Sequence, residues 1–234
     1  MSNKVWVVIP AAGVGSRMQS DRPKQYLPLG GKTVLEHTLA CFTGHPAVAG
    51  IVVVVSTSDP YWPELPVAGV SAHLAMGGKE RADSVLNGLD YLRNKLRVAA
   101  ETNVLVHDAA RPCLSRHDLN KLLAAGAEEG AGAILAVPVR DTMKRAGMAS
   151  PPQISHTENR DGLWHALTPQ MARLGVLRKA LADALQQGVT VTDEASALEY
   201  AGLNPLLVEG DARNIKITRP ADLALAEFFL AAQS

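Results

Sequence analysis

A glycine-containing loop followed by two cations is the strongest chemical signal in the sequence. Residues Pro10–Arg17 read PAAGVGSR directly after an apolar segment, and Lys24 lies seven residues after Arg17. Glycines let a backbone turn tightly and point successive N–H groups at an anion. Fixed Arg and Lys side chains stabilise the negative charge that develops on phosphate oxygens during group transfer. The loop therefore predicts a phosphate-binding site with Arg17 and Lys24 as catalytic cations.

Two familiar phosphate-binding loops do not fit this segment. A dinucleotide fingerprint needs a third glycine at position 18, where the chain has Met18. A P-loop ending at Gly31-Lys32-Thr33 would need its first glycine at position 26, which is Tyr26. A dinucleotide oxidoreductase and a P-loop ATPase are therefore weak alternatives.

Asp108 is the next candidate, because it closely follows the apolar segment Val104–Val106. Mg²⁺ in proteins takes one or two carboxylates together with phosphate oxygens and water. Asp108 would either bind such a metal or position a substrate hydroxyl. The seven histidines show no paired spacing typical of a metal site, so structural zinc is not expected. The neighbouring His107 is interpreted as a strand-end residue and not as a base.

Composition narrows the class of ligand. The 23 basic and 23 acidic side chains give a formal net charge of zero, which argues against a nucleic-acid-binding domain. Cations exceed acids within residues 1–32, which favours a small anionic ligand. Cys41 and Cys113 are far apart, no apolar run is long enough to cross a membrane, and the N-terminus does not resemble a signal peptide. We expect a cytoplasmic protein without membrane partners.

The elements that must position these groups alternate along the chain. Predicted strands are Val5–Ile9, Ile51–Val55, Val104–Val106 and Ile134–Val137, and predicted helices are Thr33–Phe42, Arg81–Leu96, a helix capped by Ser115, Leu174–Leu185, Asp193–Tyr200 and a last helix opened by Pro220. Such alternation predicts the α/β class with a mostly parallel, helix-covered sheet. We expect one Rossmann-like domain over residues 1–234, with the loop at the carboxyl edge of the sheet, where ligands bind.

Residues 138–160 interrupt this alternation. Val139–Arg145 alternates like a strand, Gly147–Pro152 is rich in turn residues, and Ile154–Arg160 is extended and polar. The segment predicts a β-hairpin arm that stands off the sheet. Because an isolated hairpin is marginally stable in water, we expect it to pack on something, plausibly the same arm of a second subunit. A disordered surface loop is the alternative.

Several separate motifs together resemble those of one enzyme family. They are Pro10–Arg17, Pro23–Leu27, Gly77-Gly78 with Glu80–Val85, Val106–Pro112, Val139–Lys144, Leu167–Gln170, Thr192–Ser196 and Asn214–Lys216. Over about Val5 to Phe229 the chain resembles the 2-C-methyl-D-erythritol 4-phosphate cytidylyltransferases of the non-mevalonate isoprenoid pathway. These belong to the sugar-phosphate nucleotidyltransferases. The resemblance implies that 2-C-methyl-D-erythritol 4-phosphate attacks the α-phosphate of CTP, giving 4-diphosphocytidyl-2-C-methyl-D-erythritol and pyrophosphate with Mg²⁺.

The resemblance also implies residue roles. The catalytic cations would be Arg17, Lys24, Arg160 and Lys216. The nucleotide would be bound by Pro10, Ala11, Ala12, Gly13, Gly15, Gly78, Ser84, Asp108 and Ala109. The sugar phosphate would be bound by Arg111, Thr142, Arg160, Thr168, Thr192 and Lys216, with Asp108 as the metal ligand. In the family, arm residues reach the neighbouring subunit's site, which implies a functional homodimer. Lys79 departs from the family, which often has Asp or a small residue there.

Two rival functions remain open at this point. A cytidylyltransferase for another alditol phosphate, such as ribitol 5-phosphate, would keep the same fold and loop. A non-catalytic nucleotide sensor is a rival from another class. Arg17, Lys24 and Asp108 argue against it, because a sensor does not need side chains that stabilise the charge formed during a reaction.

Overall fold

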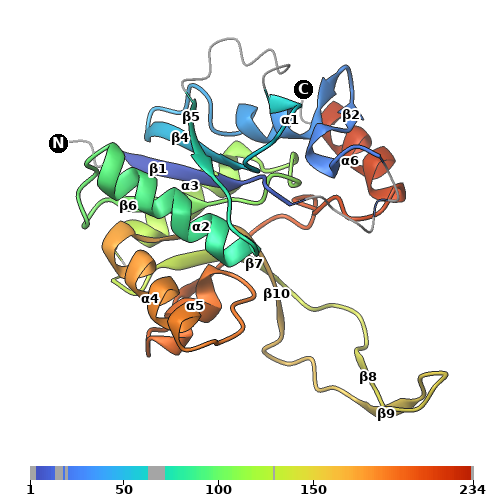
Figure 1. Cartoon of the computed structure of the whole chain (residues 1–234). Coiled ribbons are helices and arrows are strands. Elements are labelled where there is room, and N and C mark those ends of the chain that lie inside the picture. Colours follow the sequence, from blue (N-terminus) through green and yellow to red (C-terminus); the bar gives the residue numbers. More distant parts are fainter. Residues whose placement is uncertain (1–3, 14–17, 19–20, 63–71, 129, 233–234) are drawn as a thin grey trace.

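The computed structural model describes residues 4–13, 18, 21–62, 72–128 and 130–232. Within these residues the central element is a seven-stranded sheet (Figure 1). Its strand order is β11-β7-β10-β6-β1-β4-β5. The strands are β1 (Val5–Pro10), β4 (Val48–Val55), β5 (Ala72–Met76), β6 (Asn103–Val106), β7 (Ala133–Pro138), β10 (Trp164–Arg173) and β11 (Leu206–Glu209). Neighbouring strands pair in parallel except β10, which runs antiparallel to β6 and β7. The predicted α/β class and mostly parallel sheet are confirmed.

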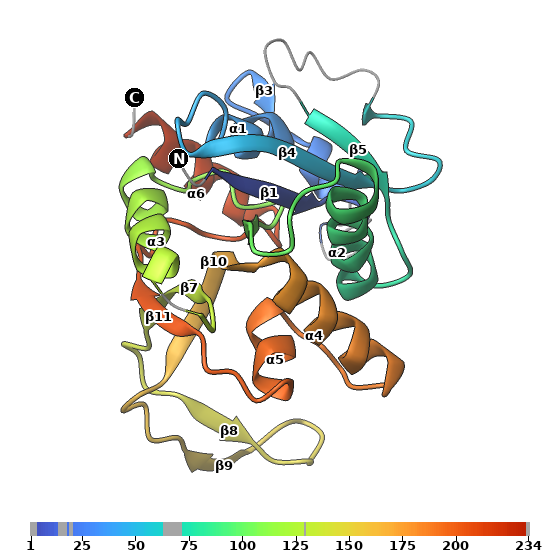
Figure 2. The ribbon, with the colours of Figure 1, turned by 90° about the vertical axis from the view of Figure 1, so that its left-hand side faces the viewer.

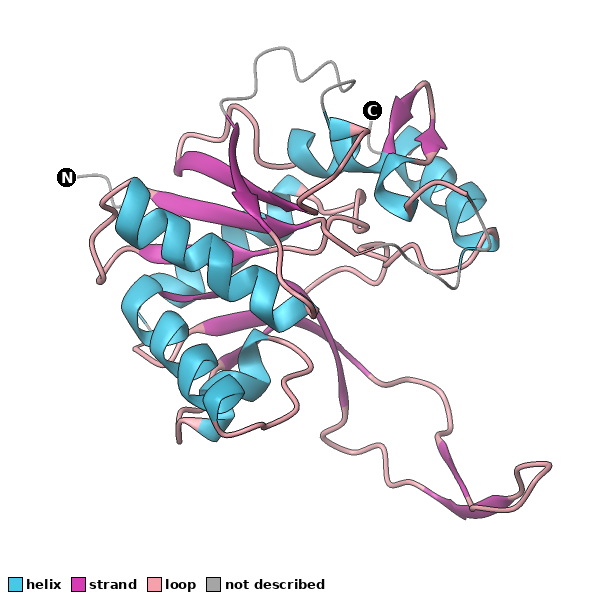
Figure 3. Cartoon of the chain, in the orientation of Figure 1, coloured by secondary structure: helices cyan, strands magenta, loops and turns pink. Residues whose placement is uncertain are grey.

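Helices cover both faces of this sheet (Figures 2 and 3). They are α1 (Val34–Ala40), α2 (Arg81–Asp90), α3 (Arg116–Glu128), α4 (Leu174–Gln186), α5 (Glu194–Tyr200) and α6 (Ala221–Ala231), with a 3₁₀ turn η2 (Lys24–Tyr26) and a π-turn η4 (Tyr91–Lys95) that continues α2. Val7 and Ile9 of β1 belong to the core that α1 and α3 complete, whereas Val8 belongs to the core of α2, α4 and α5. Both faces of β1 are therefore buried, as its continuous apolar run predicts.

Local signals set the helix starts. Thr33 caps α1 in a reciprocal capping box with Glu36, and Asp193 caps α5 in the same way with Ser196. The Ser115 hydroxyl accepts a hydrogen bond from the Asp118 N–H at 3.0 Å, as its predicted capping role requires.

Along the described residues, no helix combines the length and the apolar character that crossing a membrane requires.

The predicted arm stands away from the sheet (Figures 1 and 2). Its paired strands are β8 (Lys144–Ala146) and β9 (Ile154–Thr157), and all their residues are exposed. The prediction of a strand over Val139–Arg145 is therefore wrong for most of its length. Within the part of the chain that the structure describes, no helix or second sheet covers a face of the hairpin, so little favours longer pairing.

Strands β5, β10 and β11 were not predicted from the sequence. Strand β10 contains Pro169, which lacks the N–H that a regular ladder needs. The pairing of β10 with β7 shifts register between Ala166 and Gln170, so the proline lies in an irregularity of the ladder. Two further strands, β2 (Pro28–Leu29) and β3 (Lys32–Thr33), form a small separate hairpin.

Candidate active site

A cavity of about 270 Å³ lies where β1, β5 and β6 end. Ten of the predicted site residues are in its wall: Pro10, Ala11, Ala12, Gly13, Lys24, Gly78, Ser84, Asp108, Ala109 and Lys216. The predicted residues Gly15 and Arg17 lie outside the described residues. The carboxyl edge of a mostly parallel sheet is where α/β proteins bind ligands, so this cavity is the candidate nucleotide site.

Gln25 fixes the backbone after β1. Its amide Nε2 donates to the carbonyls of Ala11, at 2.5 Å, and Gly13, at 3.1 Å. The Ala11 N–H in turn donates to the carbonyl of Val54 at 2.7 Å, which ties the segment to β4. Gln25 is buried and was not among the predicted site residues. Its position next to Lys24, in a motif that the resemblance used, was the available signal.

A second turn, at Gly77–Glu80, closes the cavity beside α2. The Ser84 hydroxyl accepts from the Gly78 N–H at 3.0 Å and donates to the Glu80 carbonyl at 3.1 Å. A side chain at Gly78 would have its Cβ only 2.3 Å from the Cβ of Asp83, so the turn requires glycine. Ser84 is therefore buried in the cavity wall, as expected, with its hydroxyl engaged in holding this turn. A direct contact between Ser84 and the base stays a prediction.

A second cavity of about 270 Å³ adjoins the first. Its wall includes four residues predicted to bind the sugar phosphate: Arg111, Thr168, Thr192 and Lys216. Arg81, Asp108 and Lys216 line both cavities. Two ligands that occupied the two cavities would therefore meet at these three side chains.

Asp108 is the centre of a buried cluster of charges. Its Oδ1 accepts from Arg81 Nε at 3.0 Å, and its Oδ2 lies 3.3 Å from Arg111 Nε and 3.0 Å from Lys216 Nζ. Burial by itself would raise the pKa of Asp108, but the three cations, Arg81 first, hold that pKa far below its usual range. Asp108 is therefore ionised and orients the three cations that line the cavities.

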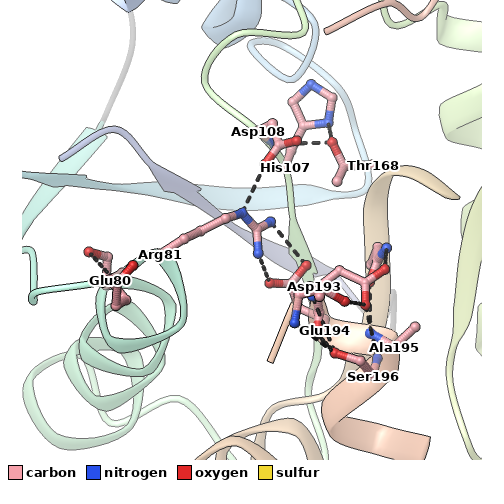
Figure 4. A network of polar contacts seen from close by, with 12 residues as sticks. Glu80, Arg81, His107, Asp108, Thr168, Asp193, Glu194, Ala195 and Ser196 are labelled. Carbon is pink, nitrogen blue, oxygen red and sulfur yellow. Dashed lines mark hydrogen bonds and ion pairs between the residues drawn. The ribbon is translucent and has the colours of Figure 1, made fainter. Parts of the chain in front are cut away.

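Arg81 links this cluster to the start of α5 (Figure 4). Its Nη1 and Nη2 donate to the two carboxylate oxygens of Glu194 at 2.7 and 3.2 Å. Neither residue was predicted as part of the site. Arg81 lies in the Glu80–Val85 motif and Glu194 in the Thr192–Ser196 motif. Their pairing, however, depends on how α2 and α5 pack.

His107 organises the other side of Asp108 (Figure 4). Its Nε2 lies 3.0 Å from the Arg111 carbonyl, which can only accept, so Nε2 carries the proton. The Thr168 hydroxyl then donates to Nδ1 at 3.0 Å and accepts from the Asp108 N–H at 3.1 Å. Burial lowers the pKa of His107 to about 4. The ring is therefore neutral at neutral pH and holds Thr168 in place.

Thr142 and Arg160 belong to the arm and to neither cavity wall. Thr142 is exposed, and Arg160 donates from Nη1 to the Arg140 carbonyl. One copy of the chain therefore does not bring these two predicted substrate-binding residues to the others. Their role across a subunit interface stays a prediction.

The described residues do not form a cage of several metal-ligating side chains. Among them, no group of three or more His, Cys, Asp or Glu side chains gathers in a way that could hold a metal ion. Both oxygens of Asp108 already face cationic side chains, which would compete with a metal. The role of Asp108 as metal ligand stays a prediction.

An open α/β sheet with a glycine-containing loop and cations at its carboxyl edge is typical of nucleotide-binding proteins. The family model of 2-C-methyl-D-erythritol 4-phosphate cytidylyltransferase (IspD) matches residues 5–232. Proteins named 2-C-methyl-D-erythritol 4-phosphate cytidylyltransferase from Vibrio parahaemolyticus and Ectopseudomonas mendocina are 57% and 56% identical to the chain. The alignments cover 95% and 96% of this chain and 94% of each relative. The chain therefore belongs to the 2-C-methyl-D-erythritol 4-phosphate cytidylyltransferase family.

Solved structures agree with this membership. A crystal structure of 4-diphosphocytidyl-2C-methyl-D-erythritol synthase is 43% identical and superposes with a TM-score of 0.84. The 2-C-methyl-D-erythritol 4-phosphate cytidylyltransferase of Francisella tularensis is 37% identical with a TM-score of 0.83. Each comparison covers 97% of this chain and 99% of the other.

Proposed function

We propose that the chain transfers CMP from CTP to 2-C-methyl-D-erythritol 4-phosphate in isoprenoid precursor biosynthesis. An oxygen of the sugar phosphate attacks the α-phosphorus of CTP, and the bond between that phosphorus and the oxygen leading to the β-phosphate breaks. The products are 4-diphosphocytidyl-2-C-methyl-D-erythritol and pyrophosphate. The observation that carries this proposal, beside the family membership, is the pair of adjoining cavities that share Arg81, Asp108 and Lys216.

The attacking group needs no general base. The second pKa of a phosphate monoester is about 6, so its oxygens are already mostly ionised at neutral pH. The barrier instead contains the repulsion between this dianion and the triphosphate. Cations fixed along the contact between the two cavities offset that repulsion and align the two phosphates.

Lys24 and Lys216 are the described cations proposed for the phosphates. The Nζ of Lys24 donates to the Ile217 carbonyl at 3.1 Å, which places Lys24 beside Lys216 in the wall of the first cavity. Lys216 is paired with Asp108, and its side chain is 36% exposed. It is therefore held by Asp108 and still accessible to a phosphate oxygen. Arg17 is proposed as a further cation on the motif alone.

Mg²⁺ is proposed as the cofactor because the triphosphate of CTP offers oxygens that Mg²⁺ binds. Mg²⁺ keeps much of its coordination shell as water and phosphate oxygens, so it does not require a cage of protein carboxylates. Removal of divalent cations with EDTA is expected to abolish pyrophosphate release, and added Mg²⁺ is expected to restore it. Equal rates with and without EDTA would contradict this part of the proposal.

We also propose how the chain is organised into a domain and how it assembles. The chain would be a single nucleotidyltransferase domain over residues 1–234, with the arm at about 138–160 joining two copies into a homodimer. Exposed apolar side chains on and beside the arm support this, because Met148 is fully exposed and Ile154 is 67% exposed. Thr142 and Arg160 would then complete the partner's second cavity. A cytoplasmic location is proposed because both cysteines are free, as is usual for proteins of that reducing compartment.

The test is pyrophosphate release with Mg²⁺, comparing CTP with UTP and 2-C-methyl-D-erythritol 4-phosphate with ribitol 5-phosphate. Release with CTP and the methylerythritol phosphate alone is the expected result. Release with ribitol 5-phosphate instead would keep the chemistry and refute the substrate. No release from a folded chain that binds CTP would favour the nucleotide sensor.

A further inference from the structure

The ion pair between Arg81 and Glu194 has no part in the reaction as described above, although Arg81 lines both cavities. We propose that Arg81 binds the phosphate of the sugar substrate where the two cavities meet, and that Glu194 is the positioning residue that holds Arg81 there. This inference rests on the proposed function. It adds a substrate contact and its support to a site for which neither residue was predicted.

The hydrogen-bond geometry leaves Arg81 able to bind a further acceptor. A guanidinium has five N–H donors. Three are directed at carboxylates: Nε at Asp108 (3.0 Å), Nη1 at Glu194 (2.7 Å) and Nη2 at Glu194 (3.2 Å). One N–H on each Nη is left for another acceptor, and the side chain is 29% exposed. These two N–H groups lie on opposite edges of the guanidinium, so each can donate a charge-assisted hydrogen bond to a phosphate oxygen on its own side.

Glu194 determines where the guanidinium of Arg81 lies. Its side chain is only 2% exposed, and both of its oxygens accept from Arg81. A buried carboxylate without a cation is strongly unfavourable. The pair therefore fixes the plane and direction of the guanidinium, which a contact with Asp108 through a single nitrogen would not do.

Gln170 in turn contacts the residues that precede and follow Glu194 in the sequence. Its Oε1 accepts from the Ala195 N–H at 2.8 Å, and its Nε2 donates to Asp193 Oδ2 at 2.9 Å. Gln170 is buried on β10, two residues beyond Thr168, which lines the second cavity. The strand that supplies the Thr168 hydroxyl thus also anchors the support of Arg81.

The charges at the junction also favour an anion. The charged side chains that line the second cavity are the cations Arg81, Arg111 and Lys216 and the acids Asp108 and Asp193, so its wall has one positive charge in excess. A site lined by an excess of one sign concentrates ligands of the other sign. The phosphate dianion of the sugar substrate has the required charge.

The test compares Arg81→Lys and Glu194→Gln with matched controls. Arg178→Lys removes a guanidinium from a surface ion pair with Asp90, and Glu199→Gln neutralises an exposed acid on the same helix as Glu194. The measurements are kcat and KM for each substrate, and calorimetric binding of 2-C-methyl-D-erythritol 4-phosphate. Lysine keeps the charge and so keeps Glu194 paired, which protects folding, but it cannot reproduce the guanidinium and its donors.

We expect Arg81→Lys to lower kcat by about 10²-fold while KM for CTP changes by less than about threefold. Glu194→Gln should lower kcat by about tenfold, since the amide retains one acceptor. In the Arg81→Lys background, Glu194→Gln should cause no further loss, because it acts through Arg81. The variant Arg81→Gln/Glu194→Gln leaves neither charge of the pair unpartnered and should fold, yet it should be as impaired as Arg81→Lys.

Three results would overturn the inference: kcat of Arg81→Lys equal to that of Arg178→Lys, an equal loss from Glu194→Gln in both backgrounds, or near-parental activity of the double glutamine variant. The unaltered chain in the same assay separates this inference from the proposed function. If it releases no pyrophosphate, the proposed function fails, and binding of the sugar phosphate decides the inference. Weaker binding by Arg81→Lys than by Arg178→Lys would support it, and equal or absent binding would refute it.

Discussion

Lowering the pH should destabilise this protein through the buried ring of His107. Burial lowers the pKa of His107 to about 4 in the folded chain, against an ordinary value of 6.5. The Arg111 carbonyl and Asp108 favour the proton, whereas the Arg111 guanidinium disfavours it. Between these two pKa values the unfolded chain binds more protons than the folded one. The contribution of His107 to the free energy of unfolding is therefore fully present above pH 6.5 and is lost as the pH is lowered toward 4.

The size of this effect follows from the two pKa values. A separation from 6.5 to about 4 corresponds to roughly 3 kcal/mol over the whole window, at about 1.4 kcal/mol per pH unit. About 2 kcal/mol of this falls between pH 7 and pH 5. The chain has six further histidines, so only a comparison with a variant that lacks the His107 imidazole isolates this contribution.

The assay is urea unfolding at pH 7 and pH 5, at one protein concentration, with His107→Gln as the comparison. Glutamine can still donate to the Arg111 carbonyl but has no group that titrates. It cannot reproduce the bond to Thr168, so the variant should be less stable at pH 7 by about 1–3 kcal/mol. The unaltered chain should lose about 2 kcal/mol more than the variant between pH 7 and pH 5. Equal losses in the two proteins would refute the reasoning.

Three further predictions concern packing, capping and charge. Gly88→Ala should lower the free energy of unfolding by about 1–3 kcal/mol, because its Cβ would lie 2.6 Å from Val8 Cγ1 and 2.9 Å from Val54 Cγ2. An unchanged urea midpoint would show that α2 can shift freely. Thr33→Ala should cost about 1 kcal/mol by removing the cap of α1, and Thr33→Ser should restore most of it in thermal unfolding. Lys24→Met should lower kcat for pyrophosphate release by about 10²-fold. Parental kcat in that variant would exclude Lys24 from the transition state.

Local sequence patterns predicted β1, β6 and α2 around the first cavity but not β5. Strands such as Val5–Ile9 and helices such as α4 follow from local apolar periodicity, which each short segment carries within itself. Ala11, Gly78 and Asp108 of the cavity wall were predicted because each belongs to a motif of the family resemblance, and Ala11 and Asp108 also follow predicted strands. The arm was also located, since its turn residues interrupt the alternation of strands and helices.

Which of these motifs meet depends on how the strands and helices pack in three dimensions. Arg81 and Glu194 are 113 residues apart, and Asp108 lies between them in the sequence. Their contact depends on β10 running antiparallel between β6 and β7, which brings Gln170, and with it the start of α5, to the edge of the cavities. Local periodicity does not specify strand order or direction, because these are set by which apolar faces pack together across the whole chain. The charge cluster that joins the two cavities is therefore a property of the fold, although each of its residues is present in a motif of the sequence.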